Sequence, residues 1–162
     1  MDENCIFCGI ASDQIPAYKV YDDGVVIAFL DINPMVSGHV LLTTKEHYPI
    51  FQAIPQEALK NLSTAMKIIS NAMLKGMKAS GTNVFVANGT AAGQKASHFI
   101  IHIIPRYPSD GQLALFVPES TGNDEELAKI QTIFIEKLKG MQHKPHVAES
   151  NLEKELTKKF DG

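Results

Sequence analysis

The hydrophobic pattern of the chain changes period at residue 56, and this change constrains the fold more than any other feature. Over residues 56–78, apolar side chains recur at steps of three and four, which places them along one face of a long helix. The side chains on that face are Leu59, Leu62, Met66, Ile69, Met73 and Met77. On both sides of this segment the sequence consists of shorter, β-prone runs.

The β-prone runs are separated by turn residues. Asp22-Asp23-Gly24 lies between the first two runs and is typical of a hairpin turn. Strands are expected at residues 17–21, 25–30, 40–44, 83–87 and 97–104, and a second, short helix at residues 124–139. This order predicts an α+β protein with a five-stranded, mainly antiparallel sheet, one long helix and one short helix.

Length and charge limit the classes of function. The 162 residues suffice for one domain, expected at 1–140, followed by a polar tail at 141–162. The formal net charge of −3 argues against a nucleic-acid-binding surface, which needs a strongly basic face. The sequence has no run of about 20 apolar residues that could span a membrane, and residues 1–4 lack the basic-then-apolar order of a signal peptide. We therefore expect a cytoplasmic protein with neither nucleic acid nor a membrane as partner.

The predicted strand at residues 97–104 carries two histidines on one face. Because alternate residues of a strand share a face, His98, Ile100 and His102 point one way, while Phe99 and Ile101 point into the core. The two histidines are compatible either with a partly exposed surface or with a functional site. The small-residue loop before the strand favours a site, because its glycines allow backbone N–H groups to approach a phosphate.

The two cysteines of the chain, Cys5 and Cys8, are separated by two residues. In a reducing compartment this spacing is typical of metal or redox chemistry rather than of a structural disulfide. Two cysteines form half of a tetrahedral zinc site. The candidates for the other half are two histidine pairs: His47 with His98, and the more closely spaced His143 with His146. A redox pair and two free buried thiols are the alternatives.

Several motifs, taken together and in order, resemble the histidine triad (HIT) family. They are Cys5–Cys8 with Ile15-Pro16, then Ala28–Pro34, then Gly38–Leu42, then Gly93-Gln94 followed by His98-x-Ile100-x-His102 and Ile-Ile-Pro-Arg. The last motif is similar to the family signature, His-x-His-x-His followed by apolar residues. The resemblance covers roughly residues 4–140.

The resemblance implies a HIT-like fold, a homodimer, and a pocket for a purine nucleoside monophosphate such as AMP or GMP. The positions that match base-binding side chains are Ile6, Phe7, Ile10, Phe29 and Ile32. Asp31 matches the carboxylate that accepts both ribose hydroxyls. The positions that match the surroundings of the α-phosphate are Asn88, Gly93, Gln94 and His102. His39 matches a histidine beside the family's active site.

The resemblance also implies a structural zinc ion, as in the zinc-binding Hint-like branch of the family. The matching ligand positions are Cys5, Cys8, His47 and His98. Closed coordination by these four side chains would fasten the N-terminal arm to the sheet.

The chain departs from the family pattern at Ile100, which stands where the resemblance places the nucleophilic central histidine. Isoleucine has no lone pair and cannot form a nucleotidyl intermediate. His102, the remaining catalytic candidate, lies about 6–7 Å further along the strand, too far for the same attack. We therefore expect a nucleotide-binding protein whose phosphoramidate and dinucleotide hydrolase activity is lost or strongly impaired. Two alternatives stay open: an active hydrolase or nucleotidyl transferase that uses another residue or a water held by His102, and a zinc-stabilised interaction module without a ligand.

Overall fold

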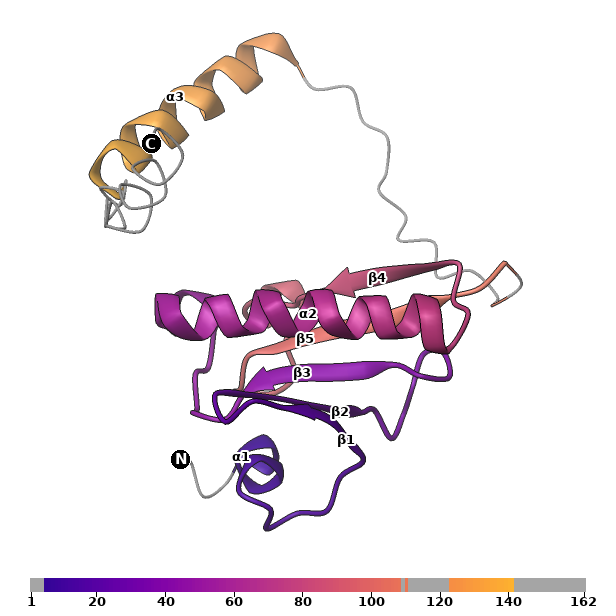
Figure 1. The fold of residues 1–162 in the computed structure, drawn as a ribbon. Coiled ribbons are helices and arrows are strands. Elements are labelled where there is room, and N and C mark those ends of the chain that lie inside the picture. Colours follow the sequence, from indigo (N-terminus) through magenta and orange to yellow (C-terminus); the bar gives the residue numbers. More distant parts are fainter. Residues whose placement is uncertain (1–4, 109, 111–122, 142–162) are drawn as a thin grey trace, which may run out of the picture. The chain divides into compact units, whose positions relative to one another are not determined.

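The computed structural model describes residues 5–108, 110 and 123–141, and it divides the chain into two units (Figure 1). The first unit is Met1–Leu113 and the second is Ala114–Gly162. The second predicted helix belongs to the second unit, whereas the sequence analysis assigned it to the domain at 1–140. Residues 142–162 of the predicted tail, including His143 and His146, lie outside the described residues, so the tail and its boundary stay predictions.

A five-stranded antiparallel sheet forms the centre of the first unit, which confirms the predicted α+β class. In spatial order the strands are β1 (Lys19–Asp22), β2 (Val26–Leu30), β3 (Val40–Thr44), β5 (Ile100–Arg106) and β4 (Gly81–Phe85). The bounds of β3 agree with the prediction, and the other strands are shifted by up to three residues. β5 starts later than predicted because the N–H of Phe99 donates to the carbonyl of Tyr48, in a loop, and not to a neighbouring strand.

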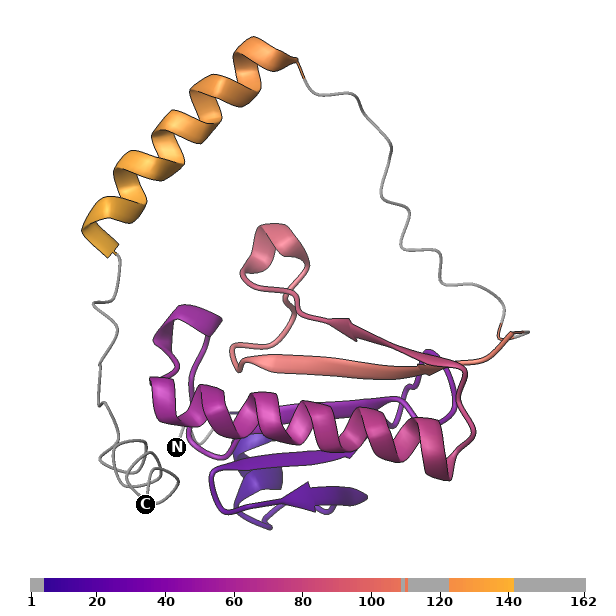
Figure 2. The ribbon, with the colours of Figure 1, turned by 45° about the horizontal axis from the view of Figure 1, so that its top comes forward.

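One face of the sheet is covered by α2 (Gln56–Gly76), the long helix that the sequence predicts (Figures 1 and 2). Leu62, Ile69 and Met73 are buried in a core cluster that also contains Phe99 and Ile101 of the sheet side. Met77, predicted on the same helix face, lies just beyond the last turn and is exposed.

The opposite face of the sheet carries a second, smaller core cluster beneath α1 (Ile6–Ala11). Its buried members are Ile10, Ala11, Ile27, Phe29 and Leu41. The sequence analysis did not predict α1, because six residues are too short for a periodic pattern and the side chain of Cys5 at its N-cap makes no capping hydrogen bond. Tertiary contacts must therefore hold this helix in place. Two 3-10 helices, η1 (Phe51–Ala53) and η2 (Thr90–Ala92), complete the first unit's described elements.

The second unit contains α3 (Asp124–Met141), which confirms the predicted second helix, although it is nearly as long as α2. Asn123 caps its first turn, since the side-chain oxygen accepts hydrogen bonds from the N–H groups of Glu125 and Glu126. Acidic side chains in the first turn and Lys139 in the last turn interact favourably with the helix dipole.

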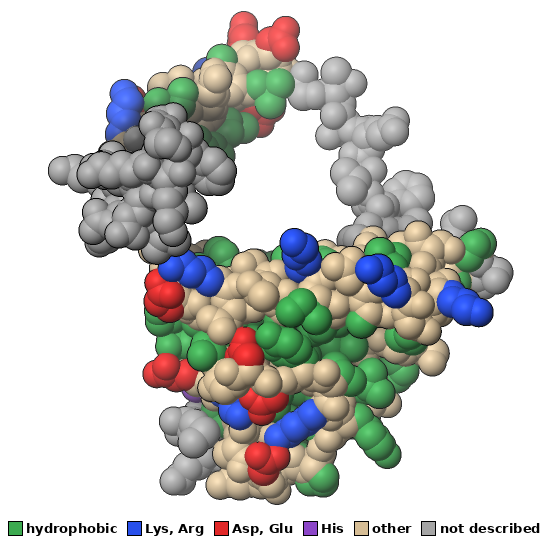
Figure 3. Space-filling model, viewed as in Figure 1, with side chains coloured by type: hydrophobic (Ala, Val, Ile, Leu, Met, Phe, Trp, Pro, Cys, Tyr) green, Lys and Arg blue, Asp and Glu red, His purple; other side chains and the backbone are tan. Residues whose placement is uncertain are grey.

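Among the described residues, no helix combines the length and the apolar composition needed to cross a membrane. Figure 3 shows basic side chains spaced one by one along α2, without a continuous basic stripe on this face.

Candidate functional site

A largely apolar cavity of about 590 Å³ lies beside α1 and the end of β2. Every residue that the sequence analysis assigned to base or ribose binding lines it: Ile6, Phe7, Ile10, Phe29, Asp31 and Ile32. The rings of Phe7 and Phe29 are stacked, with centroids 6.2 Å apart and an interplanar angle of 25°. These two rings give the cavity a flat apolar wall of the kind that suits a planar ligand.

A second cavity of about 440 Å³ adjoins the first. The two cavities share Phe7, Asp31, Asn33 and Leu41 in their walls, so that one elongated ligand can occupy both. The sequence analysis did not single out Asn33 and Leu41, nor Phe85 in the second cavity. Their apolar or turn-forming character gives no signal in the sequence. Asn33 follows β2, Leu41 lies on β3 and Phe85 on β4, so only the formation of the sheet brings them together.

The strand β5 presents Ile100 and His102 to the second cavity. Both side chains are half-buried, and Ile100 packs against the smaller core cluster. Phe99 and Ile101, on the other face, are buried under α2. The alternation predicted for this strand is therefore confirmed, and the wall of the cavity at residue 100 is a branched alkyl group.

The predicted phosphate-binding residues differ in where the structure places them. Gly93 and Gln94 line the second cavity, together with the exposed Lys95. The amide of Gln94 braces the loop, since it accepts from the N–H of Gly89 and donates to the carbonyls of Pro49 and Ala96.

Asn88 lies outside the described walls of both cavities. Its side chain accepts from the N–H of Phe51 at 2.9 Å and donates to Gln52 at 3.0 Å. In this structure Asn88 therefore holds η1 against the loop, and a role of Asn88 in phosphate binding stays a prediction.

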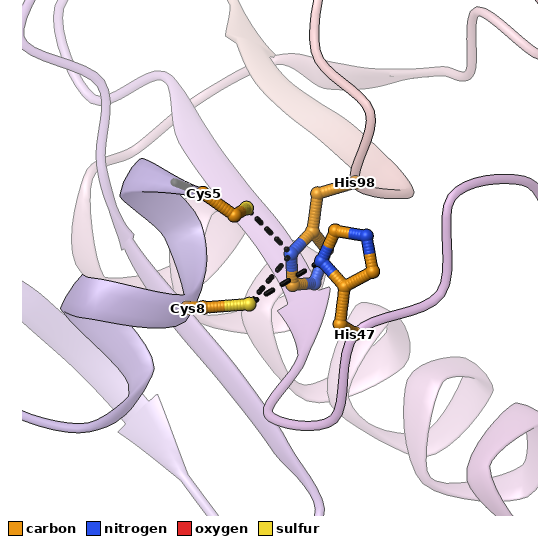
Figure 4. A group of neighbouring side chains, drawn as sticks. All are labelled: Cys5, Cys8, His47 and His98. Carbon is orange, nitrogen blue, oxygen red and sulfur yellow. Dashed lines mark hydrogen bonds between the residues drawn. The ribbon is translucent and has the colours of Figure 1, made fainter. Parts of the chain in front are cut away.

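The four predicted zinc ligands converge next to the second cavity, and we call them the Cys/His cluster (Figure 4). Cys5 and Cys8 come from the start of α1, His47 from the loop after β3, and His98 from the segment before β5. The sulfur of Cys5 lies 3.3 Å from Nδ1 of His98, and the sulfur of Cys8 lies 3.3 Å from Nδ1 of His47 and 3.8 Å from Nδ1 of His98.

The geometry and chemistry of the Cys/His cluster fit zinc. With Zn–S and Zn–N bonds near 2.3 and 2.0–2.1 Å, tetrahedral coordination requires S···N distances of about 3.5 Å, and the observed distances bracket this value. The Nε2–H of His98 donates to the carbonyl of Thr44 at 3.1 Å, which leaves Nδ1 unprotonated toward the sulfurs. Burial also lowers the pKa of His98, which keeps the ring neutral, as a metal ligand must be.

A second polar cluster, which we call the Asp/His group, consists of Asp31, His39 and His102. Nε2 of His39 lies 3.0 Å from Nδ1 of His102, and Nδ1 of His39 lies 3.3 Å from a carboxylate oxygen of Asp31. His39 is only 2% exposed. Burial is the main cause that lowers the pKa of both His39 and His102, against an opposing effect of Asp31.

Local backbone geometry positions His39. Gly38 precedes it with φ of +91°, a left-handed conformation that favours glycine, and a Cβ at this position would collide with the side chain of Met77. The N–H of His39 donates to the carbonyl of Val36, and its carbonyl accepts from the N–H of Asp31. The turn therefore holds the imidazole between Asp31 and β5.

The fold and this site define an α+β protein with two adjoining cavities and a two-cysteine, two-histidine cluster at their side. Residues 12–109, more than half of the chain, match the family described as HIT domain. The chain therefore belongs to the HIT family.

Known relatives and structures agree with this membership. The chain is 44% identical over 112 residues to an uncharacterized HIT-like protein of Methanocaldococcus jannaschii, covering 69% of this chain and 86% of that protein. It is 33% identical to the adenosine 5'-monophosphoramidase of Saccharomyces cerevisiae, covering 86% of each. The structure of a zinc-bound histidine triad family protein from Mycobacterium smegmatis superposes with a TM-score of 0.64 at 27% identity, covering 86% of this chain and 98% of that one.

Proposed function

We propose that this HIT-family protein binds a purine nucleoside monophosphate, such as AMP or GMP, across the two adjoining cavities. The observation that carries the proposal is that Asp31 lines both an apolar cavity and a cavity whose wall includes a glycine, a lysine and two histidines. A nucleotide has the same order of chemistry: a flat base, a diol and a phosphate. A yeast relative of this chain is an adenosine 5'-monophosphoramidase, which supports a nucleotide of this kind.

We further propose that the hydrolase activity of the family is lost or strongly impaired in this chain. The alkyl side chain of Ile100 lines the second cavity at the place where the resemblance puts the attacking imidazole. It offers neither a lone pair for attack on phosphorus nor a donor to a phosphate oxygen. His102 remains in the same wall, so turnover by an activated water is the outcome that would contradict the proposal.

The third part of the proposal is a structural zinc ion in the Cys/His cluster. Cys8 lies on α1, which also carries Ile6, Phe7 and Ile10 of the first cavity. A metal held there would fasten this uncapped, six-residue helix to β3 and β5. We propose that the ion keeps the base-binding wall of the first cavity in place and does not itself contact the nucleotide.

A homodimer through β4 and a cytoplasmic location complete the proposal. β4 is an edge of the sheet, and three consecutive apolar side chains at and just beyond its end are exposed: Val84, Phe85 and Val86. An open edge of this kind supports pairing with a second copy of the chain. Sedimentation of the protein and of a Val84→Lys variant tests the dimer.

Calorimetry with AMP and GMP, combined with turnover of adenosine phosphoramidate, tests the proposal. We expect saturable binding and no turnover at ordinary enzyme rates. Ile32→Ser, in a cavity-lining residue that is 82% exposed, should weaken binding, whereas Ile68→Ser, at a 47% exposed position on α2, should not. Absence of heat with both nucleotides would refute nucleotide binding, and rapid turnover would refute the loss of activity.

A further inference from the structure

The Asp/His group joins the two cavities through a residue that lines neither of them. Asp31 lines both cavities and His102 lines the second, while His39, buried between them, is absent from the described walls. The proposed function uses the two ends of this group, at the ribose and at the phosphate, but assigns nothing to the imidazole between them.

The hydrogen bonds of His39 allow two arrangements of protons. Because burial lowers the pKa of both imidazoles, each ring is neutral near neutral pH and carries one proton. In the first arrangement, Nδ1–H of His39 donates to Asp31, and Nε2 of His39 accepts from Nδ1–H of His102. Nε2 of His102 then presents a lone pair to the cavity.

In the second arrangement, the backbone N–H of Met35 donates to Nδ1 of His39, at 3.4 Å. Nε2–H of His39 then donates to Nδ1 of His102 across the same 3.0 Å contact. As a result Nε2 of His102 carries its proton and presents a donor to the cavity. Nδ1 of His39 must carry a proton to donate to Asp31 and must be unprotonated to accept from Met35, so the two arrangements exclude each other.

We propose that His39 couples the two cavities, so that engagement of Asp31 by a ligand's hydroxyl groups converts His102 from an acceptor into a donor for an anion. This coupling rests on the proposed function for the identity of the ligand. Without a ligand, the carboxylate is the stronger partner for His39 and favours the first arrangement.

The ribose hydroxyl groups and the phosphate of a nucleotide both favour the second arrangement. One oxygen of Asp31 accepts from the N–H of Asn33 and the other lies beside Nδ1 of His39. Hydroxyl groups that donate to this carboxylate take up acceptor capacity and charge that His39 otherwise uses, and so they weaken its bond to Asp31. A phosphate oxygen needs a donor, and the lone pair on Nε2 of His102 would repel it. Since each part shifts the same equilibrium, each must strengthen the binding of the other, reciprocally.

The conversion balances without a net change in charge. One proton arrives from water at Nε2 of His102, the shared proton moves from Nδ1 of His102 to Nε2 of His39, and one proton leaves Nδ1 of His39 to water through Asp31. Each ring keeps one proton. His39 is a positioning residue in this scheme, because it contacts neither the base nor the phosphate.

Nitrogen-15 NMR of histidine-labelled protein tests the proposal directly, because protonated and unprotonated ring nitrogens have distinct chemical shifts. In the free protein we expect the proton of His102 on Nδ1. Saturation with adenosine, which has the diol but no phosphate, should move it to Nε2, and Asp31→Ala should do so without any ligand. Glu57→Ala, an exposed carboxylate on α2, is the matched control. His102→Gln assigns the signal.

The outcomes separate this proposal from the function on which it rests. If adenosine does not bind, nucleotide binding fails, while Asp31→Ala still reports on the coupling. If His102 keeps the same proton in the free, adenosine-bound and Asp31→Ala proteins, the coupling is refuted.

Calorimetry with inorganic phosphate gives a second measure. We expect phosphate to bind about fivefold or more tightly in saturating adenosine, and the difference to disappear in His39→Phe. An equal affinity with and without adenosine in the wild-type protein would overturn the proposal.

Discussion

The Cys/His cluster and the Asp/His group lie on the two sides of Ile100 along β5, and they use histidine in opposite ways. His98 and His47 both turn Nδ1 toward sulfur, and Nε2 of His98 is held by the carbonyl of Thr44. His102 turns Nδ1 toward another imidazole, His39, which leaves Nε2 for the cavity.

The contrast shows that the hydrogen-bond partner of one ring nitrogen determines whether the other nitrogen carries a proton, and therefore whether it can donate, accept or bind a metal. A backbone carbonyl can only accept, so it permits one proton position on His98 and suits a permanent metal ligand. The imidazole of His39 can donate or accept, so it permits two proton positions on His102 and suits a site that responds to a ligand. Ile100 lies between the two clusters, and its alkyl side chain can neither donate nor accept a hydrogen bond.

Replacing Ile100 should have the largest effect on activity. Ile100→His places an imidazole between His98 and His102, and we expect turnover of adenosine phosphoramidate to rise about a thousandfold or more, since loss of a nucleophile can reduce rates by about six decades. Steady-state kinetics measures it. Ile100→Gln, polar but not nucleophilic, is the control and should show no gain. An inactive Ile100→His protein that still binds AMP would mean that the site lacks more than the nucleophile.

Removing a ligand of the Cys/His cluster should have the next largest effect. Cys8→Ser should lose zinc, and a metal present at a thousandfold excess over its Kd stabilises by about 4 kcal/mol, or roughly 8–16 °C in Tm. AMP affinity should fall as well, because α1 carries part of the first cavity. Metal analysis and thermal melting measure these changes. A chelator should lower the wild-type Tm to that of the variant and leave the variant unchanged; equal melting with and without zinc would contradict the structural role.

Acidification should act on the Asp/His group. The pKa values of His39 and His102 are lowered in the folded protein from the ordinary value of 6.5, so the unfolded chain binds protons first as the pH falls. Their contribution to stability is therefore complete above pH 6.5 and is lost as the pH falls from there toward the folded pKa values, with a limiting slope of about 1.4 kcal/mol per pH unit for each proton.

Melting temperatures between about pH 5 and 8, at saturating zinc, measure this slope. His102→Gln removes one of the two groups and should flatten it relative to wild type. An identical pH profile for both proteins would show that His102 is as easily protonated in the folded state as in the unfolded chain.

The smallest expected effect concerns the exposed Lys95 at the mouth of the second cavity. Lys95→Ala should weaken AMP binding by about two- to fivefold at low salt, because an exposed charge contributes little, and the difference should shrink as salt is added. Calorimetry at two salt concentrations measures it, with Lys75→Ala on α2 as the control. A much larger loss that persists in high salt would mean that Lys95 contacts the phosphate directly.

The parts of the fold that follow from local periodicity were predictable. The apolar period of α2 and the alternation along β5 both predict which face each side chain takes, and the structure confirms them except at Met77, which lies beyond α2 and is exposed. α1 was not predictable, because a six-residue helix without a capping side chain has no periodic signal and depends on contacts with β2 and β3.

The candidate site divides in the same way. Cys5, Cys8, His98 and His102 could be identified from spacing and resemblance, and the structure brings them to the positions described above. The contacts of Asn88 with η1 and the hydrogen bond from His98 to Thr44 could not be foreseen, because they join segments that are distant in sequence.

The sequence by itself determined which side chains share a face, and that an alkyl group stands between two imidazoles, because both follow from residue identity and the two-residue repeat of a strand. The tertiary structure alone decided what each imidazole faces. His98 faces sulfur and a backbone carbonyl, His102 faces the imidazole of His39, and His39 faces the carboxylate of Asp31 as well. The reason is that a ring's proton is set by its hydrogen-bond partners, and these partners come from strands and loops that only folding brings together.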